Sequence, residues 1–514
     1  MSEENTKQEP KYNENTKYSK MSDPINTTRN GILSIIGAIF HRLGIMSMMA
    51  FMGFSTYMIS YLRRYQSEDE TPLSLNYTYF IMPILTITIG IGVPFSGVLE
   101  YKMGTRLLIV YGSLYLILSS VIQYFSKVVY LNFFAIFIFA IGFSLSIAIT
   151  GKNACMYFPT RRGLISGILS CIQAIFASIL NIFGEKVIIN PKSIEPFRGF
   201  YTFEAAQNIT KYYLFQIGCV TICTIIGVSL IVGYKLRGKR RGPRGDMKKK
   251  ADENITDNID SNGPLIPDNE KEEEEKEKEN EEEKEKEKEN NKNEENNDKD
   301  AQIKVNEKES TVNYSMNQVK HAARSFRVWR LFLMNIFSAP LNNFIIIAWR
   351  PISIYKEMPT NIIQNVNSFT SMTQMIITPL FGYLSDKIPF RVMKIILGII
   401  NFIAGILFYF SFKNVYFFVG LIILNSFANH GTFALNEPHY MKVFGMKHVI
   451  EISGIIGLAN VIMGPICSIS AFLIEQNLKE KLDEVYCYMF IISSLLVTVD
   501  IGLSFFETEE PLFE

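Results

Sequence analysis

The sequence predicts an all-α polytopic membrane protein with twelve transmembrane helices in two six-helix bundles. Three observations predict this class. Of the 514 residues, 48% are hydrophobic. Roughly 45 of the 101 charged residues lie in residues 236–325, so the remainder is far less charged than the roughly 25% typical of soluble domains. Apolar runs of about 20 residues, the length that crosses a bilayer as a helix, recur on both sides of that charged segment.

Six apolar runs precede the charged segment and six follow it. We place the spans at residues 43–63, 77–98, 105–125, 130–151, 163–184, 212–234, 328–349, 364–384, 392–411, 414–436, 449–474 and 485–506. The second, fourth, eighth and tenth runs are interrupted by Thr, Ser, Asn and Gly, which suits helices that face a cavity rather than lipid.

The domain organisation follows from these runs. We expect two six-helix bundles at 43–234 and 326–506, with cytosolic tails at 1–42 and 507–514. Residues 235–325 include the almost wholly charged stretch 271–290, which cannot bury a core, so we interpret the segment as a disordered cytosolic linker.

The short loops set the expected orientation. Lys and Arg favour the cytosolic side of a membrane, and if the spans alternate the following all fall on one side: Lys102, Arg106, Arg161, Arg162, Lys387, Arg391, Lys394, Lys442 and Lys447. Residues 1–30 are polar, so we expect no cleavable signal peptide. No targeting signal is evident, which makes the plasma membrane the default location and an organelle membrane the alternative.

Several other classes are excluded or disfavoured. The formal net charge of +1 gives no basic field for nucleic acid. The six cysteines lie in or beside apolar runs and show neither a disulfide framework nor a zinc spacing. No G-x-x-x-x-G-K-S/T phosphate loop occurs. We therefore expect no enzyme activity, no metal and no cofactor.

The two predicted bundles repeat each other weakly. GVLEYKMGTR (97–106) follows the second span and GYLSDKIPFR (382–391) follows the eighth, 285 residues later, while Ser166-Gly167 and Ser453-Gly454 repeat at an offset of 287. Glycine lets helices approach closely, and a neighbouring acid can cap a facing helix N-terminus or pair with Arg. We interpret the two motifs as a conformational gate made of Gly97, Glu100, Lys102, Gly104, Arg106, Gly382, Asp386, Lys387 and Arg391.

These motifs resemble the G-x-L-x-D-R/K-x-G-x-R/K loops of the major facilitator superfamily. The resemblance implies a major facilitator fold and transport by rocking of the two bundles. Two positions depart from the pattern: Tyr101 stands where the family has Asp, and Pro389 where it has Gly. The first motif would then depend on Glu100 or be weak.

A narrower resemblance starts at MYFPTRRGLISGI (156–168). It is similar to the junction between the fourth and fifth spans of the oxalate:formate antiporter and monocarboxylate transporter group, and the matching residues are Phe158, Pro159, Arg162, Gly163 and Gly167. This implies a small organic anion as the substrate. That group's span-8 Asp and Arg are replaced here by Gln374 and Thr378, and only Asn460 is offered in place of its span-11 Lys.

Other side chains are candidates for the missing cation and its neighbours. A carboxylate in a low-dielectric cavity needs a cation or several donors. We nominate as substrate-binding residues Arg350, Asn343, Asn342, Gln374, Thr378, Asn429, His430, Asn460 and Lys152. Each has a structural alternative: Arg350 and Lys152 could anchor the membrane boundary, and His430, which could couple protons, could be a hydrogen-bonded core histidine.

One further pair is placed at the first span. His41 and Arg42 precede it by one residue and read as boundary residues, although a deeper span would place them in a cytosolic-side gate.

The sequence therefore predicts a secondary active transporter that moves a small, monocarboxylate-like organic anion across the bilayer, with or without a coupled proton. The alternative substrate is an amino acid or another polar metabolite, because Gln374 and Thr378 suit a neutral or zwitterionic solute. A non-transporting receptor or scaffold, with the long loop as its partner site, is the rival from another class.

Overall fold

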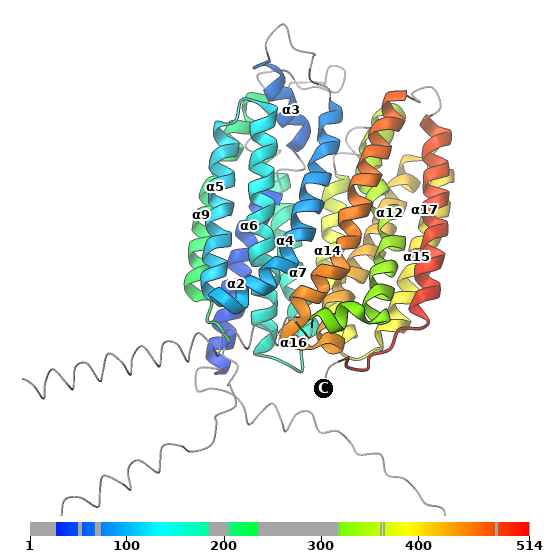
Figure 1. Ribbon diagram of the computed structural model, residues 1–514. Coiled ribbons are helices and arrows are strands. Elements are labelled where there is room, and N and C mark those ends of the chain that lie inside the picture. Colours follow the sequence, from blue (N-terminus) through cyan, green and yellow to red (C-terminus); the bar gives the residue numbers. More distant parts are fainter. Residues whose placement is uncertain are drawn as a thin grey trace, which may run out of the picture. The chain divides into compact units, whose positions relative to one another are not determined.

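The computed structural model describes residues 27–49, 54–66, 75–184, 206–234, 319–359, 365–477 and 482–512, together with a few single positions. The regular secondary structure of these residues is helical, with no strand, as Figure 1 shows. Most of the expected linker at 235–325 lies outside the described residues, and so does most of the expected N-terminal tail.

The N-terminal bundle consists of helices that stand side by side (Figure 1). They are α2 (Thr28–Met49), the short α3 (Ser55–Arg63) and η2 (Leu75–Phe80), α4 (Ile81–Met103), α5 (Thr105–Phe125), α6 (Val129–Met156), α7 (Arg162–Phe183) and α9 (Ile209–Leu230). The C-terminal bundle contains α12 (Phe326–Tyr355), α14 (Val366–Ser385), α15 (Phe390–Ser411), α16 (Val415–Asn477) and α17 (Leu482–Ser504).

Twelve of the described segments can cross a membrane. Ten helices are long and apolar enough by composition, and α16, at 63 residues, contains two spans because its backbone turns at Gly445. The φ of 72° at Gly445 is in the left-handed region that favours glycine. The twelfth segment is α14, which has 20 residues but is too polar to be recognised by apolarity alone. The predicted fold class is confirmed.

The first helix lies elsewhere than the sequence suggested. It begins at Thr28 rather than at residue 43, so residues 28–42, which we assigned to a cytosolic tail, form most of α2. The reason lies in His41 and Arg42, which look like membrane-boundary residues. Both are buried inside the protein, with exposures of 0% and 5%, so neither meets lipid.

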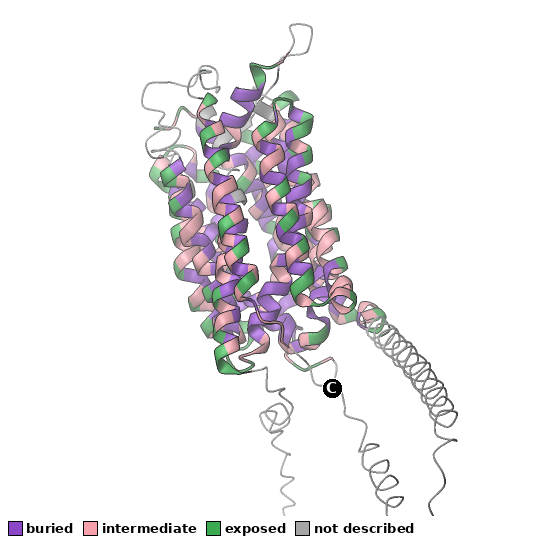
Figure 2. Cartoon of the chain, turned by 90° about the vertical axis from the view of Figure 1, so that its left-hand side faces the viewer, coloured by how far each residue is buried: buried purple, intermediate pink, exposed green. Residues whose placement is uncertain are grey.

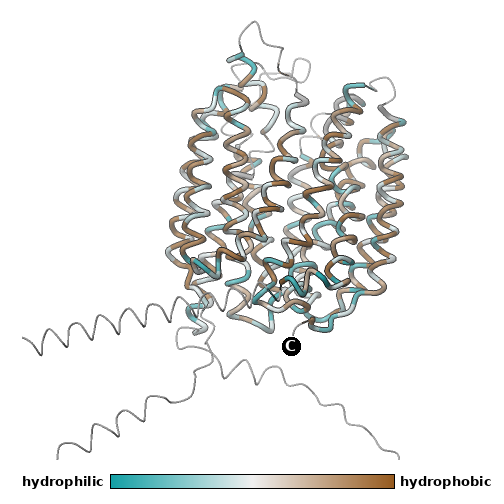
Figure 3. The backbone as a smooth tube through the Cα atoms, viewed as in Figure 1, coloured by the Kyte–Doolittle hydropathy of each residue, from teal (hydrophilic) through white to brown (hydrophobic). Residues whose placement is uncertain are grey.

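The outer surface of both bundles is apolar. Large hydrophobic side chains such as Phe95, Phe125 and Tyr416 are more than 60% exposed. Figure 2 shows the exposed residues on the outward faces of the helices, and Figure 3 shows hydrophobic residues along their length. A surface of this kind is stable in lipid, and the chain is a multi-pass membrane protein.

Glycines line the two seams where the bundles meet. On the seam between α4 and α16, a Cβ at Gly454 would lie 2.5 Å from the Pro94 ring. On the seam between α7 and α14, a Cβ at Gly167 would lie 2.6 Å from the Thr378 carbonyl oxygen. Neither position could accept a methyl group without a shift, so both seams are close helix contacts made possible by small residues.

Candidate functional site: an inter-bundle gate and a central polar cluster

The gate motifs and the basic loops lie at one end of the bundle, which we call the hairpin end. The α4–α5 turn is made at Gly104, whose φ of 83° again favours glycine, and the α14–α15 turn passes through Pro389. The basic residues of both motifs, Lys102, Arg106, Lys387 and Arg391, are exposed there. These basic residues lie at the same end of the protein, as expected for loops on one side of the membrane. Figure 3 shows hydrophilic residues gathered at this end.

The second motif holds the start of α7. The carboxylate oxygens of Asp386 accept hydrogen bonds from the backbone N–H groups of Gly163 and Leu164, both at 3.2 Å. An anion at a helix N-terminus is stabilised by the unpaired N–H groups and by the helix dipole. Beside it the backbones touch, because a Cβ at Gly382 would collide with the Gly163 carbonyl oxygen. The gate motif and the junction between the fourth and fifth spans, which the sequence presents separately, therefore form one contact between the bundles.

The first motif makes a different contact. Tyr101, which stands at the acidic position of the pattern, donates its hydroxyl hydrogen to the Lys447 carbonyl at the start of the second α16 segment. In the first motif a Tyr101 hydroxyl therefore donates to a carbonyl, whereas in the second motif the Asp386 carboxylate accepts from backbone N–H groups. The neighbouring Glu100 stays within its own bundle, where it accepts a hydrogen bond from Thr105 at 2.9 Å.

Lys152 takes part in the contact made by the first motif. Its Nζ lies 2.9 Å from Glu100 Oε2, and the residue is only 5% exposed. The same ammonium group donates to the Lys447 carbonyl at 3.4 Å, which connects α6 with the other bundle. Lys152, which we nominated as a substrate-binding cation, is therefore already neutralised by a carboxylate.

A second group of polar residues lies further from the hairpin end, and we call it the central polar cluster. It consists of Arg42 on α2, Ser166 and Gln173 on α7, and Glu437 on α16. Arg42 Nη1 donates to Gln173 Oε1 at 3.1 Å, and Ser166 donates to Glu437 Oε2. The cluster therefore joins two helices of the N-terminal bundle to one of the C-terminal bundle.

Arg42 and Glu437 are near neighbours. A Cβ at Gly151 on α6 would lie 2.7 Å from Arg42 Nη2 and 3.1 Å from Glu437 Oε1, so the two side chains flank one point. The Nε of Arg42 is buried and has no hydrogen-bond partner in the described part of the chain. A buried guanidinium with spare donors is suited to bind a carboxylate.

The remaining nominated residues do not form one site. Thr378 is fully buried, and its hydroxyl donates to the Gln374 carbonyl one turn earlier at 2.9 Å. Its backbone packs on Gly167, so Thr378 contributes to the packing of α14 on α7. Asn343 is buried, and among the described residues its Nδ2 has no partner. No hydrogen bond between described side chains joins the others, which are the partly buried Asn342, Gln374, Asn429 and His430 and the exposed Asn460. The side chain of Arg350 lies outside the described residues.

The other junction residues have structural surroundings. The helix α6 ends just before Phe158 and Pro159, and a Cβ at Gly31 would lie 3.0 Å from the Phe158 ring, so Phe158 packs on the start of α2. Arg162 is the first residue of α7.

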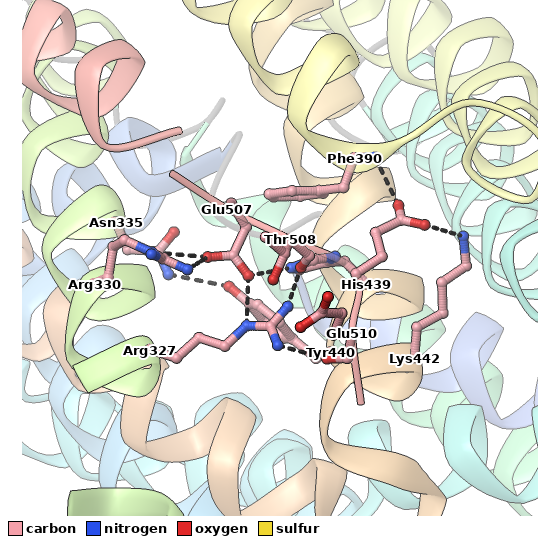
Figure 4. Close-up of polar contacts among 11 residues, drawn as sticks. Arg327, Arg330, Asn335, Phe390, His439, Tyr440, Lys442, Glu507, Thr508 and Glu510 are labelled. Carbon is pink, nitrogen blue, oxygen red and sulfur yellow. Dashed lines mark hydrogen bonds and ion pairs between the residues drawn. The ribbon is translucent and has the colours of Figure 1, made fainter. Parts of the chain in front are cut away.

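The residues after α17 are docked on the C-terminal bundle, as Figure 4 shows. Glu507 Oε1 lies 2.9 Å from Arg327 Nε and 3.1 Å from His439 Nε2, and its Oε2 lies 2.9 Å from Arg330 Nε. Further along, the Leu512 N–H donates to the Val443 carbonyl at 2.8 Å. We call residues 507–512 the C-terminal clasp, because they hold α12 and α16 together at the hairpin end.

The electrostatics of Glu507 follow from this arrangement. Burial by itself raises the pKa of its carboxyl, but the hydrogen bond with His439 and the ion pair with Arg327 outweigh burial and hold the pKa below 4.5. Glu507 was not among the residues for which we expected a partner. Its signal was the spacing of Arg327 and Arg330, which lie on one face of α12.

A second buried ion pair braces the same bundle. Lys394 Nζ on α15 lies 3.1 Å from Asp500 Oδ2 on α17, and both residues are 3% exposed or less. Asp500 therefore joins two helices of one bundle. Among the described residues, no three His, Cys, Asp or Glu side chains are grouped so that they could hold a metal ion.

Comparison with known proteins places the fold. No family model and no curated protein matches the sequence. Solved structures do match. The human organic anion transporter MFSD10 (TETRAN) is 9% identical with a TM-score of 0.54, and the match covers 92% of this chain and 100% of that one. The E. coli fucose:proton symporter FucP is 12% identical with a TM-score of 0.57, and the match covers 93% of this chain and 98% of that one. The proton:xylose symporter XylE is 10% identical with a TM-score of 0.54, and the match covers 92% of this chain and 94% of that one.

These likenesses define the class of fold. The chain has the major facilitator fold over nearly its whole length. At identities of 12% and below, the likeness concerns the fold alone, and the substrates of those proteins are not transferred by it.

Proposed function

We propose that the chain is a secondary active transporter of the major facilitator superfamily that works by alternating access. The fold supports this, and so does the construction of the two seams, where close glycine contacts and a few polar links join the bundles. Bundles joined in this way can rock against each other around a central site. No nucleotide is needed, because an ion or solute gradient drives such a cycle.

We propose that the substrate is a small organic anion of the monocarboxylate type and that Arg42 binds its carboxylate. The observation that carries this proposal is the buried Arg42 guanidinium at the inter-bundle cluster, for which Gln173 is the only hydrogen-bond acceptor among the described residues. Arg42 supplies a cation that the span-8 Thr378 does not. MFSD10, which shares the fold, is itself described as an organic anion transporter.

A second candidate substrate is a zwitterion such as an amino acid. The observation that favours it is Glu437, whose carboxylate lies beside Arg42 and could bind an ammonium group while Arg42 binds the carboxylate. The two candidates differ in what Glu437 does. For an anion it is a neighbour that must be neutralised, and for a zwitterion it is a binding group.

The test is uptake into liposomes containing the purified protein. Arg42→Ala should raise the KM for the transported solute at least about tenfold, the cost of a lost hydrogen bond to a charged group, and Arg42→Lys should recover part of it. Arg29→Ala is the matched control, because Arg29 is exposed on the same helix. Unchanged uptake in Arg42→Ala would refute the assignment. Glu437→Gln distinguishes the substrates, since it should impair amino-acid uptake and spare monocarboxylate uptake.

A further inference from the structure

One buried carboxylate at the gate has no role in the contacts described above. Glu451, on the second segment of α16, is 2% exposed and packs against the Gly97 backbone of the first motif. A Cβ at Gly97 would lie 2.7 Å from Glu451 Cδ. The side chain is therefore enclosed between α16 and α4, on the seam that must part when the hairpin end opens.

The groups around Glu451 compensate its charge only in part. Lys152 faces it from α6, Glu100 and Tyr101 face it from α4, and His448 lies one turn earlier on its own helix. Lys152 is the cation of this group, but its ammonium is bonded to Glu100. The Tyr101 hydroxyl hydrogen is directed to the Lys447 carbonyl. Within the described residues, neither Glu451 oxygen makes a hydrogen bond, although the Tyr101 hydroxyl lies near enough to favour the charged carboxylate.

One cation thus faces two carboxylates in a closed contact. A buried charge without a partner is costly, and the cost is removed when the group takes up a proton. Glu100 is bonded to Lys152 and Thr105, whereas Glu451 makes no hydrogen bond among the described residues, so we place the proton on Glu451.

We propose that Glu451 is the proton-binding group of the gate: its carboxyl is protonated when the hairpin end is closed and releases the proton when that end opens to water. The inference rests on the proposed alternating-access transport, to which it adds the site and the direction of proton coupling. Proton uptake accompanies closure of the hairpin end, so closure is favoured as the pH falls. For one proton, the ratio of closed to open protein changes up to tenfold per pH unit.

The experiment measures the opening of the hairpin end directly. Spin labels are placed at Lys102→Cys and Lys447→Cys, both exposed on opposite sides of the seam, in a background whose six cysteines are replaced by alanine. Distances between the labels are recorded from pH 5 to pH 9 in the full-length protein. We expect the short distance to dominate at low pH and a longer one to grow as the pH rises.

Substitutions then identify the group that titrates. Glu451→Gln, which imitates the protonated acid, should hold the short distance at every pH, and Glu451→Asp should keep the pH dependence with a shifted midpoint. Glu484→Gln is the control, because Glu484 is an exposed carboxylate. A Glu451→Gln protein that opens with pH as the parent does would overturn the proposal. So would a distance in the labelled parent that does not respond to pH, a result that does not depend on the folding of any Glu451 variant.

The same variants separate this inference from the proposed function. If the protein transports, Glu451→Gln should lose at least about tenfold of proton-driven accumulation while solute exchange across the membrane continues. If no solute is transported, the distance measurement still decides whether Glu451 titrates with the gate.

Discussion

Arg42 and Glu437 show what could be read at the scale of single residues. A charged residue near the start of an apolar run usually marks the membrane boundary, and only the fold shows that Arg42 is enclosed by other helices. The sequence did not mark Glu437 as a site residue, because it follows the predicted tenth span by one residue and so reads as part of a loop. The partners of both residues come from distant parts of the sequence, and a local pattern does not reveal such pairs.

Asp386 and Tyr101 were more accessible to prediction. The repeat predicts that each motif ends in a gate contact, and the spacing identifies the residue at the acidic position. What the sequence left open was whether Glu100 would replace the missing acid. The structure gives that role to Tyr101, because Glu100 is bonded within its own bundle.

Glu507→Gln tests the C-terminal clasp. Removing one partner of a buried ion pair leaves Arg327 and Arg330 uncompensated, so we expect the variant to lose about 3 kcal/mol of stability at neutral pH. Thermal unfolding in detergent measures it. Glu510→Gln is the control, because Glu510 is exposed and bonds Arg327 only through its backbone carbonyl.

The pH dependence of this effect has a defined sign. The pKa of Glu507 is lowered in the folded protein, so its contribution is complete above 4.5, the ordinary value, and disappears as the pH falls through the folded-state value. The parent and Glu507→Gln should therefore differ at pH 7 and converge in acid. A difference that persists or grows at low pH would contradict the ion-pair account.

At the scale of elements, periodicity and length predicted most helices but not their ends. The start of α2 was misplaced because the charges at His41 and Arg42 were taken to mark the membrane boundary, whereas the turn at Gly445 lies between the predicted tenth and eleventh spans. The glycines of the repeat carried the most useful information. They predicted close helix contacts, and Gly163 and Gly382 prove to touch each other across the seam between α7 and α14.

Gly382→Ala tests that contact. The added methyl group would collide with the Gly163 carbonyl, and overpacking of this kind costs about 1–3 kcal/mol, which should lower the closed population of the hairpin end roughly tenfold. Spin labels at Arg161→Cys and Lys387→Cys, both exposed beside this seam, would report a longer distance.

Gly420→Ala is the matched control for this variant. Gly420 is also a helical glycine, on α16, but no neighbouring atom lies within 4 Å of its Cβ position. The distance between the labels should not change in the control. If both alanine variants behave alike, the contact between α7 and α14 does not hold the gate.

At the scale of the whole molecule, the number of spans and the division into two bundles were readable from the sequence. Apolar length is a strong signal, and the charged segment separates the two series of runs. The way in which the bundles meet was not readable. It depends on pairs such as Asp386 with Gly163, which are more than 200 residues apart. It also depends on the hydrogen bond of the Tyr101 hydroxyl to the other bundle, which the composition of the sequence does not indicate.

Uptake by the purified protein in liposomes tests the central claim most directly. Labelled lactate, pyruvate, formate and a mixed amino-acid pool are offered with and without an inward proton gradient, and Arg42→Ala is run in parallel. We expect a monocarboxylate to accumulate without ATP, faster with the gradient, and Arg42→Ala to reduce it at least about tenfold. If folded protein moves none of these solutes faster than protein-free liposomes do, the account of a carboxylate transporter built around Arg42 is wrong.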